Sequence, residues 1–324
     1  MGVDMTDNDN TTADAKTTRP SKTAGRSGSE AQEASQSHWW SLPQPIKRVF
    51  DRFPLLTYPA NALPQRAPRY RNENILYIFQ SEESRSRHAP SFNPSCLKWQ
   101  AYLKFHGIPL RTQASNNHAS PTGSLPFLLP ASSDPQRPAS PVPANRLARW
   151  VISQGGQEEA VQPRQEAYTA LIDHNIRSAW LFYLYLDENN FRSAAWPMYV
   201  ESASTSYAVR ASLGQQLRNA AREELLKTNT IIDGQDLYAK AEEAFQALSW
   251  LLGDNKFFFG QTTPGLFDAS LFAYTQIILD DDLEWKTPTL KLALQQYENL
   301  VQHRIRLIRG FFSSREEKEQ NAAN

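Results

Sequence analysis

The sequence predicts a small α+β domain followed by an all-helical domain. Two observations support this prediction. Short apolar strand runs flank one amphipathic helix between residues 73 and 155, and helical stripes of apolar residues fill residues 160–312. The chain has 324 residues, which leaves enough for two hydrophobic cores of ordinary size once a polar N-terminal lead is set aside.

The first elements are expected to be a strand, a helix and a second strand. Ile75–Phe79 is a short apolar run typical of a buried strand. Pro94 favours a turn into a helix, and Gly107 favours the end of that helix. The apolar face of the helix is expected to contain Cys96, Trp99 and Leu103. The second strand is expected where Ile108, Leu110 and Thr112 alternate with other residues.

The rest of the α+β domain follows a polar loop. Leu125-Pro126 leads into a third strand, Phe127–Leu129. Because the segment 121–143 contains seven prolines, a fourth strand is expected only around Val142. A helix at Ala144–Gln154 is expected to close the domain.

Residues 155–163 are interpreted as a linker to the helical domain. The first helix there has an apolar stripe made of Tyr168, Leu171, Ile172, Ile176, Ala179 and Tyr183. Further helices are expected at roughly 205–227, 236–252, Asp268–Leu279 and Pro288–Arg309. The expected apolar face of helix 236–252 is Leu237, Ala241, Ala244, Leu248 and Leu251. That of the last helix is Leu290, Leu294, Tyr297, Val301, Ile305 and Ile308.

Two terminal segments and one arm are expected to lie outside both domains. Residues 1–37 contain no aromatic residue, Leu or Ile and are predicted to be a disordered lead, and residues 313–324 a disordered tail. Residues 38–72 are predicted to form a Pro-rich arm, in which six Lys or Arg residues stand against one acid, Asp51. Its candidate partner-docking residues are Trp39, Trp40, Ile46, Phe50 and Phe53. They could equally fold back onto their own domain.

Composition and spacing exclude several classes of function. Lys+Arg and Asp+Glu both number 34, so no global charge attracts the chain to nucleic acid. The single Cys excludes an intrachain disulfide and a Cys-cluster metal site. The spacing of His106, His118, His174 and His303 does not match metal ligands, so no metal or other cofactor is expected. The longest apolar run, Trp180–Leu186, is shorter than the ~20 residues that span a bilayer, so membrane association is expected to be peripheral.

Two segments carry a family resemblance. NPSCLKWQAYLKFHGIPL at residues 93–110, followed by Leu125-Pro126, resembles the thioredoxin-like half of a glutathione transferase, where a cis-proline stands beside the active site. LSWLLGDNKFFFGQTTPGLFDASLFAY at residues 248–274 resembles the helical domain of the same family. The resemblance implies an α+β thioredoxin-like N-terminal domain (73–155) followed by an all-α glutathione-transferase-like C-terminal domain (160–312).

The finer motifs are similar to those of the metaxins, transferase-like subunits of the mitochondrial outer-membrane sorting and assembly machinery. The residues that carry this similarity are Pro94, Cys96, Leu97, Tyr102, Leu103 and Pro109. The lead-in Pro54–Tyr70 resembles the fungal branch of the family. The resemblance implies a non-catalytic, peripheral receptor subunit on the cytosolic face of that membrane, which binds β-barrel precursors and aids their insertion. The implied partners are the β-barrel core subunit, a second metaxin-like subunit and the final strand of the precursor.

Catalytic residues are expected to be absent. Transferases activate the glutathione sulfur with a Ser, Tyr or Cys at the start of the first helix, where this chain has Asn93. They hold the γ-glutamyl group with an acid-Ser pair, where this chain has Ala144-Asn145. The alternative is a glutathione-dependent transferase, or a small-ligand binder, that uses a nearby hydroxyl such as Ser91.

Four residues are expected to define the fold and to carry no chemistry. Pro94 begins the helix, Cys96 is interpreted as a small buried hydrophobic residue, and Pro126 as a retained fold element. Asp268 is interpreted as an N-cap or staple residue; the usual capping Ser or Thr is replaced by Gly265, so Thr262 or Thr263 could compensate. Near the C-terminus, the cluster of Arg304, Arg306, Arg309, Phe311 and Phe312 is either a solvated helix end or a contact with lipid headgroups.

Overall fold

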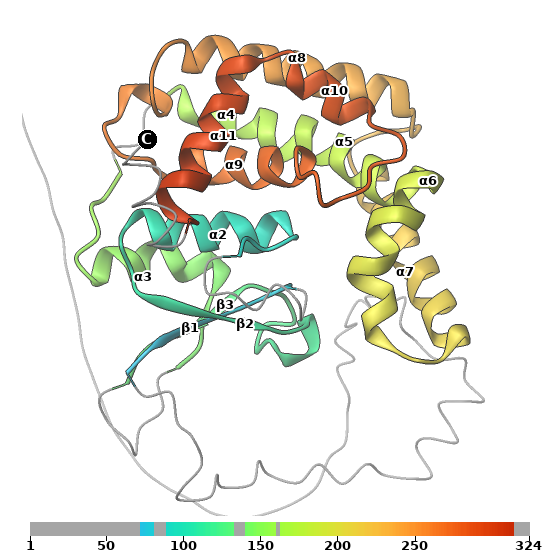
Figure 1. The fold of residues 1–324 in the computed structure, drawn as a ribbon, viewed down its shortest axis with the longest axis horizontal. Helices are drawn as coiled ribbons and strands as arrows, with labels where there is room; N and C mark the ends of the chain where they lie inside the picture. The colour runs from blue at the N-terminus through green and yellow to red at the C-terminus, as the bar shows by residue number, and fades with distance from the viewer. Residues whose placement is uncertain (1–71, 81–88, 133–139, 160–162, 314–324) are drawn as a thin grey trace, which may run out of the picture. The chain divides into compact units, whose positions relative to one another are not determined.

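The computed structural model describes residues 72–80, 89–132, 140–159 and 163–313 (Figure 1). These residues belong to one compact unit, Pro68–Asn324. The predicted lead, the docking residues Trp39, Trp40, Ile46, Phe50 and Phe53, and the tail from residue 314 lie outside the described residues. No helix in the described ranges combines the length and the apolar character needed to cross a bilayer.

A four-stranded mixed sheet forms where the sequence places it. Its strands are β1 (Asn74–Ile78), β2 (Leu110–Ala114), β3 (Phe127–Leu129) and β4 (Val142–Pro143), in the order β2-β1-β3-β4. β1 runs parallel to β2 and antiparallel to β3, which is antiparallel to β4. The Tyr77 and Phe127 rings stack across the β1–β3 pair, with centroids 4.5 Å apart. All four predicted strands are thus confirmed.

Helix α2 (Pro94–Phe105) follows β1, with proline in its first turn. The helix ends where Gly107 adopts a φ of +66°, a conformation that glycine reaches without strain. Cys96 and Leu103 are buried as predicted, whereas Trp99 is only half-buried and Leu97 and Ala101 are buried instead. Residues on more than one face of α2 are buried because the helix lies between the sheet and helices α9 and α11 (Figure 1).

The predicted helix at 144–154 is a 3₁₀ turn (Ala144–Arg146) followed by α3 (Leu147–Ser153). The next helix runs without a break but alternates in type, because two π-helical segments, Leu171–Ile176 and Phe182–Leu186, follow α4 (Gln165–Ala170) and α5 (Arg177–Leu181). Each π turn adds a residue and rotates the following side chains. From the predicted stripe, Ile172, Ile176, Ala179 and Tyr183 are buried, while Tyr168 and Leu171 are half-buried.

Residues 188–226 form a helical hairpin, of which the sequence predicted only the second arm. Its second arm, α7 (Tyr207–Leu226), confirms the helix expected at 205–227. Its first arm was not predicted: it consists of α6 (Glu188–Asn190), a π-helical segment (Phe191–Val200) and a 3₁₀ turn (Glu201–Ala203). Pro197 lies inside this arm, and a proline normally indicates a helix end.

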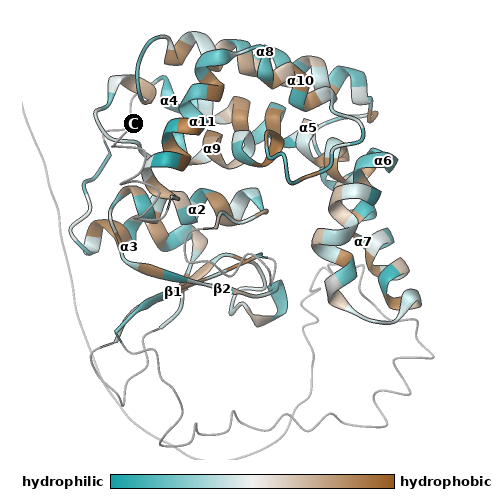
Figure 2. Ribbon diagram, in the orientation of Figure 1, coloured by the Kyte–Doolittle hydropathy of each residue, from teal (hydrophilic) through white to brown (hydrophobic). Residues whose placement is uncertain are grey.

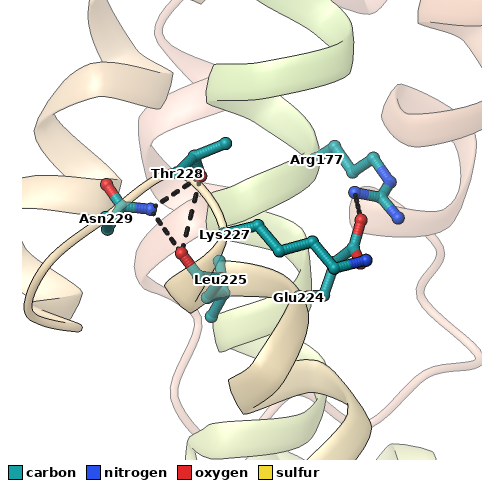
Figure 3. Close-up of polar contacts among 6 residues, drawn as sticks. All are labelled: Arg177, Glu224, Leu225, Lys227, Thr228 and Asn229. Carbon is teal, nitrogen blue, oxygen red and sulfur yellow. Dashed lines mark hydrogen bonds and ion pairs between the residues drawn. The ribbon is translucent and has the colours of Figure 1, made fainter. Parts of the chain in front are cut away.

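Polar contacts fix the base of the hairpin to the rest of the helical domain. The buried Asn190 side chain accepts from Thr287 N and donates to Thr287 O, at 2.9 and 3.0 Å. Arg177 Nη1 donates to Glu224 Oε1 at 2.9 Å, and Asn229 Nδ2 donates to the last-turn carbonyl of Leu225 (Figure 3). The base therefore has partners on both of its arms.

Four further helices complete the domain: α8 (Gly234–Leu252), α9 (Leu266–Ile278), α10 (Thr289–Gln295) and α11 (Glu298–Phe311). In α8, which alternates between apolar and polar positions in Figure 2, Leu237, Ala241, Ala244 and Leu248 are buried as predicted and Leu251 is half-buried. The prediction of a single helix at 288–309 is wrong, because Gln296-Tyr297 separates α10 from α11. As a result Leu300, His303 and Leu307 form the buried face, in place of Val301, Ile305 and Ile308.

A buried carboxylate, that of Asp268, accepts several hydrogen bonds at the start of α9. Asp268 is the third residue of the helix and not its N-cap, which is Gly265. The Asp268 carboxylate accepts hydrogen bonds from Phe258 N (3.1 Å), Gly265 N (3.0 Å) and His303 Nε2 (2.8 Å). Asp268 is 2% exposed. One carboxylate thus joins the aromatic turn at 258–260, the start of α9 and the middle of α11.

Glu159, from the predicted linker, supplies the second acceptor at this helix start. Its Oε1 accepts from Leu266 N at 2.8 Å, whereas the sequence had suggested that Thr262 or Thr263 could compensate for the missing cap. A Cβ atom on Gly265 would stand only 2.8 Å from Glu159 Oε2, so glycine at this position makes room for the carboxylate. Where the capping pattern lacks a Ser or Thr side chain, the side chain of Glu159, a residue distant in sequence, binds the helix start.

We expect Asp268→Ala to lower the free energy of unfolding by about 3–5 kcal/mol, because it leaves a buried imidazole and two backbone N–H groups without their acceptor. Asp233→Ala is the matched control, since Asp233 is the exposed N-cap of α8 and should cost about 1 kcal/mol. Urea unfolding followed by circular dichroism measures both. Equal losses in the two variants would contradict the role given to Asp268.

Candidate functional site at the start of helix α2

The candidate site lies where β1 ends and α2 begins. The loop Ser91–Asn93 enters the helix there. The peptide Leu125-Pro126 is cis, Pro126 is buried, and it directly precedes β3. Since Tyr77 pairs with Phe127, the antiparallel register places Pro126 beside Ile78, at the end of β1 that leads toward α2. The structure therefore brings Pro94, Cys96 and Pro126 to one end of the sheet.

Asn93 uses both ends of its amide. Its Oδ1 accepts from Cys96 N at 3.2 Å and caps α2, and its Nδ2 donates to Tyr199 Oη at 3.2 Å. A neutral amide is neither a nucleophile nor a proton donor of useful acidity. At the position where a transferase activates sulfur, this chain therefore has a helix cap that also binds a tyrosine from the hairpin.

Tyr199 packs among aromatic rings near the helix start. Its ring meets Phe79 and Phe92 edge-on, with centroids 5.5 and 5.2 Å away, and it also lies 6.1 Å from the ring of Tyr185. Burial raises the pKa of Tyr199 well above its usual value and that of Tyr185 to about 12. Both phenols therefore stay neutral at physiological pH and act as packing and hydrogen-bonding groups.

Cys96 is inaccessible at the same place. Its side chain has no exposed surface, and burial raises the pKa of the thiol to about 12, against smaller opposing effects from the backbone of Phe79 and the side chain of Ser91. Because the thiolate is the reactive species, such a thiol is inert near neutral pH.

Ser91, the hydroxyl considered as an alternative nucleophile, is occupied by structural contacts. Its Oγ donates to Phe79 O and accepts from Asn93 N, and the residue is 1% exposed. The buried Gln100 side chain completes the arrangement, since it accepts from Ser91 N at 2.9 Å and donates to Ala89 O at 2.8 Å. Ser91 thus ties the loop before α2 to the end of β1.

The other positions assigned to glutathione binding hold no suitable group. Ala144-Asn145 begins the 3₁₀ turn after β4, and that turn has no acidic residue. The histidines are dispersed: His303 bonds to Asp268, and His106 Nε2 lies 4.0 Å from Glu159 Oε1. Throughout the described ranges no three His, Cys, Asp or Glu side chains gather as metal ligands would.

The aromatic pair near the C-terminus packs against its own fold. Phe311 meets Phe105 at 4.7 Å, and the buried Phe312 meets Phe272 at 5.5 Å. Lys104 Nζ donates to Phe311 O. Arg304 donates to Gln276 and Arg306 to Lys256 O. The two phenylalanines that were the candidate headgroup contact therefore pack against α2 and α9.

Sequence reasoning missed Tyr199, Glu159, Asn190 and His303. Each acts through a partner far away in the chain: Tyr199 and Asn93 are separated by 106 residues, and Glu159 and Leu266 by 107. Only Glu159 has a signal in the sequence, which is the incomplete capping pattern at Gly265.

Three family models match the chain. "Glutathione S-transferase N-terminal domain" matches residues 94–190, "Glutathione S-transferase, C-terminal domain" matches 241–307, and "SAM35, subunit of SAM complex" matches 40–97. The first two agree with a thioredoxin-like α+β part followed by a transferase-like helical part, so the predicted fold class is confirmed.

Similar proteins include metaxins. Metaxin-3 of Xenopus laevis is 27% identical over 238 residues, which are 69% of this chain and 74% of that protein. Metaxin-1 of Macaca fascicularis is 25% identical over 235 residues, 69% of this chain and 71% of that protein. One similar solved structure is a glutathione transferase family member from Pseudomonas fluorescens with two glutathione molecules bound. It is 10% identical, has a TM-score of 0.45, and the match covers 76% of this chain and 95% of that one.

We expect the folded chain to resist alkylation of Cys96. At about pH 8 only on the order of 10⁻⁴ of a thiol with a pKa near 12 is ionised, and the side chain is buried. Iodoacetamide should modify the urea-unfolded chain quickly and the native chain only at the rate of unfolding, as followed by mass spectrometry. The sequence has one Cys, so no other thiol obscures the result. Equal rates in both states would show that the thiol is accessible.

Proposed function

We propose that this chain, which is similar to the metaxins, is a member of that family and a non-catalytic receptor subunit of the mitochondrial outer-membrane sorting and assembly machinery. In this role it binds β-barrel precursors and aids their insertion, and it attaches peripherally to the cytosolic face of the outer membrane. Its partners are the β-barrel core subunit of the machinery and a second metaxin-like subunit.

The observation that carries the non-catalytic part is the contact between Asn93 and Tyr199. In support of the proposal, the residue at the start of α2 is an amide that caps the helix and bonds to a phenol. The buried thiol of Cys96 and the structural bonds of Ser91 support the same conclusion, because each candidate nucleophile is already committed to packing. A glutathione-dependent enzyme remains the alternative that a binding measurement must exclude.

Membership of the assembly machinery rests on the family model for the SAM complex subunit. That model matches residues 40–97 and so includes four of the five candidate docking residues, Trp40, Ile46, Phe50 and Phe53. This family model includes the arm together with β1 and the start of α2. We therefore favour a role of the arm that family members share over the view that it is a dispensable extension. We therefore retain docking of this arm on a partner subunit as part of the proposal.

Precursor recognition follows from the chemistry of an unfinished barrel. The last strand of a precursor exposes unpaired backbone groups and a row of alternate apolar side chains. A protein without catalytic groups can bind such a strand by pairing with its backbone and accepting its side chains in pockets. Recognition of this kind needs no cofactor.

We expect affinity purification of the tagged full chain from detergent-solubilised mitochondria to recover an outer-membrane β-barrel protein and a second metaxin-like chain. Photo-crosslinkers in the final strand of an arriving barrel precursor should then trap this chain, and a polar substitution at the apolar positions of that strand should remove the adduct. Matrix-targeted precursors serve as the control and should give no adduct.

Two results would contradict the proposal. Recovery of no β-barrel protein would place the chain outside the machinery. Recovery of the barrel with crosslinks only to that barrel would leave the chain as a structural brace without a receptor role.

A further inference from the structure

Three aromatic side chains of the helical domain each bury a polar atom that has no hydrogen-bond partner among the described residues. The atoms are Tyr183 Oη, Tyr238 Oη and Trp285 Nε1. They come from three elements: the π-helical segment Phe182–Leu186, α8, and the loop between α9 and α10. Tyr183 is fully buried and Trp285 is 9% exposed, while Tyr238 is half-buried with its hydroxyl closed to solvent.

The three side chains belong to one cluster. The ring centroid of Tyr183 lies 4.5 Å from that of Trp285 and 6.3 Å from that of Tyr238, which it meets edge-on. Burial is the largest cause that raises the pKa of Tyr183, followed by the neighbouring Tyr238 phenol and the Asp187 carboxylate. Burial and then Asp187 also raise the pKa of Tyr238. The two hydroxyls are therefore neutral and lie near each other and near Asp187.

This cluster adjoins the base of the hairpin. Asp187 caps the first arm, since its Oδ1 accepts from Asn190 N at 2.9 Å. Trp285 stands two residues before Thr287, whose backbone exchanges two hydrogen bonds with the Asn190 side chain. Tyr238 brings α8 to the same place. A group that bound the three polar atoms would therefore connect α8 to the helix and the loop that hold the hairpin.

The chemistry of the three atoms identifies the ligand. Buried polar groups are nearly always paired with protein or with ordered water. An indole N–H only donates, whereas each phenol can donate and accept, so one water molecule with about three hydrogen bonds complements the set. An anion would also accept from three donors, but the negative charge of Asp187 opposes it. We propose that one ordered water molecule binds Tyr183 Oη, Tyr238 Oη and Trp285 Nε1 and bridges the base of the hairpin to α8.

The test removes one hydroxyl at a time from the full chain and keeps the ring. Loss of an unpaired buried hydroxyl is neutral or stabilising, whereas loss of a hydroxyl bound to water is destabilising. Tyr183→Phe and Tyr238→Phe should each lower the unfolding temperature by about 2–4 °C in scanning calorimetry. The double variant should lose less than the sum, because the two hydroxyls share one bridge. Tyr207→Phe is the matched control and should unfold at the wild-type temperature, since Tyr207 is 79% exposed.

A crystal structure of the wild type at high resolution provides the second measurement. It should show a water molecule within hydrogen-bond distance of all three atoms, and the double variant should lack it. Unchanged or higher unfolding temperatures of both single variants, or losses that add fully in the double variant, would overturn the inference. So would a crystal structure in which the two hydroxyls bond directly to each other or to another side chain. A bromide ion at this place in bromide-soaked crystals would assign the site to an anion and overturn the inference as well.

Discussion

The carboxylate of Asp268 joins three segments of the helical domain: the aromatic turn at 258–260, the start of α9 and the middle of α11. It accepts two backbone N–H bonds and one imidazole bond in a site almost closed to water, so each partner would be costly to leave unpaired. Helix α9, which starts there, packs against α2 on one side and against α10, α11 and the π-helical segment Leu171–Ile176 on others. Without this helix start, the thioredoxin-like part would lose the surface on which α2 rests.

Glu159, in the connection between the two halves, also binds the start of α9. Glu159 and His106 are both half-buried there, and burial raises the pKa of the Glu159 carboxyl and lowers the pKa of the His106 imidazole. Lys104 and Phe105 bind the last turn of α11 from the other end of α2. These contacts hold α2 at its end, and the bond between Asn93 and Tyr199 of the hairpin holds it at its beginning.

The sequence predicts helix ends and strands correctly where the residues that determine them are close together in the chain. Pro94 and Gly107 mark the two ends of α2, and alternating or continuous apolar runs mark the strands, because these features act over one turn or one pleat. It was insufficient where the period changes, as in the π-helical segments and the arm that contains Pro197. At the candidate site, Asn93 was identified but Tyr199 was not, since a contact across 106 residues leaves no trace in local spacing.

The central proposal is that this transferase-like fold performs no glutathione chemistry, because the start of α2 carries Asn93, which caps the helix and bonds to Tyr199. The most direct test is a calorimetric titration of the full chain with glutathione. The account predicts no saturable heat for the wild type, since Tyr199 and Asn93 close the start of α2 and no acid-Ser pair is available for the γ-glutamyl group. One-to-one binding that Asn93→Ala weakens would contradict the account and return the protein to the glutathione-dependent enzymes.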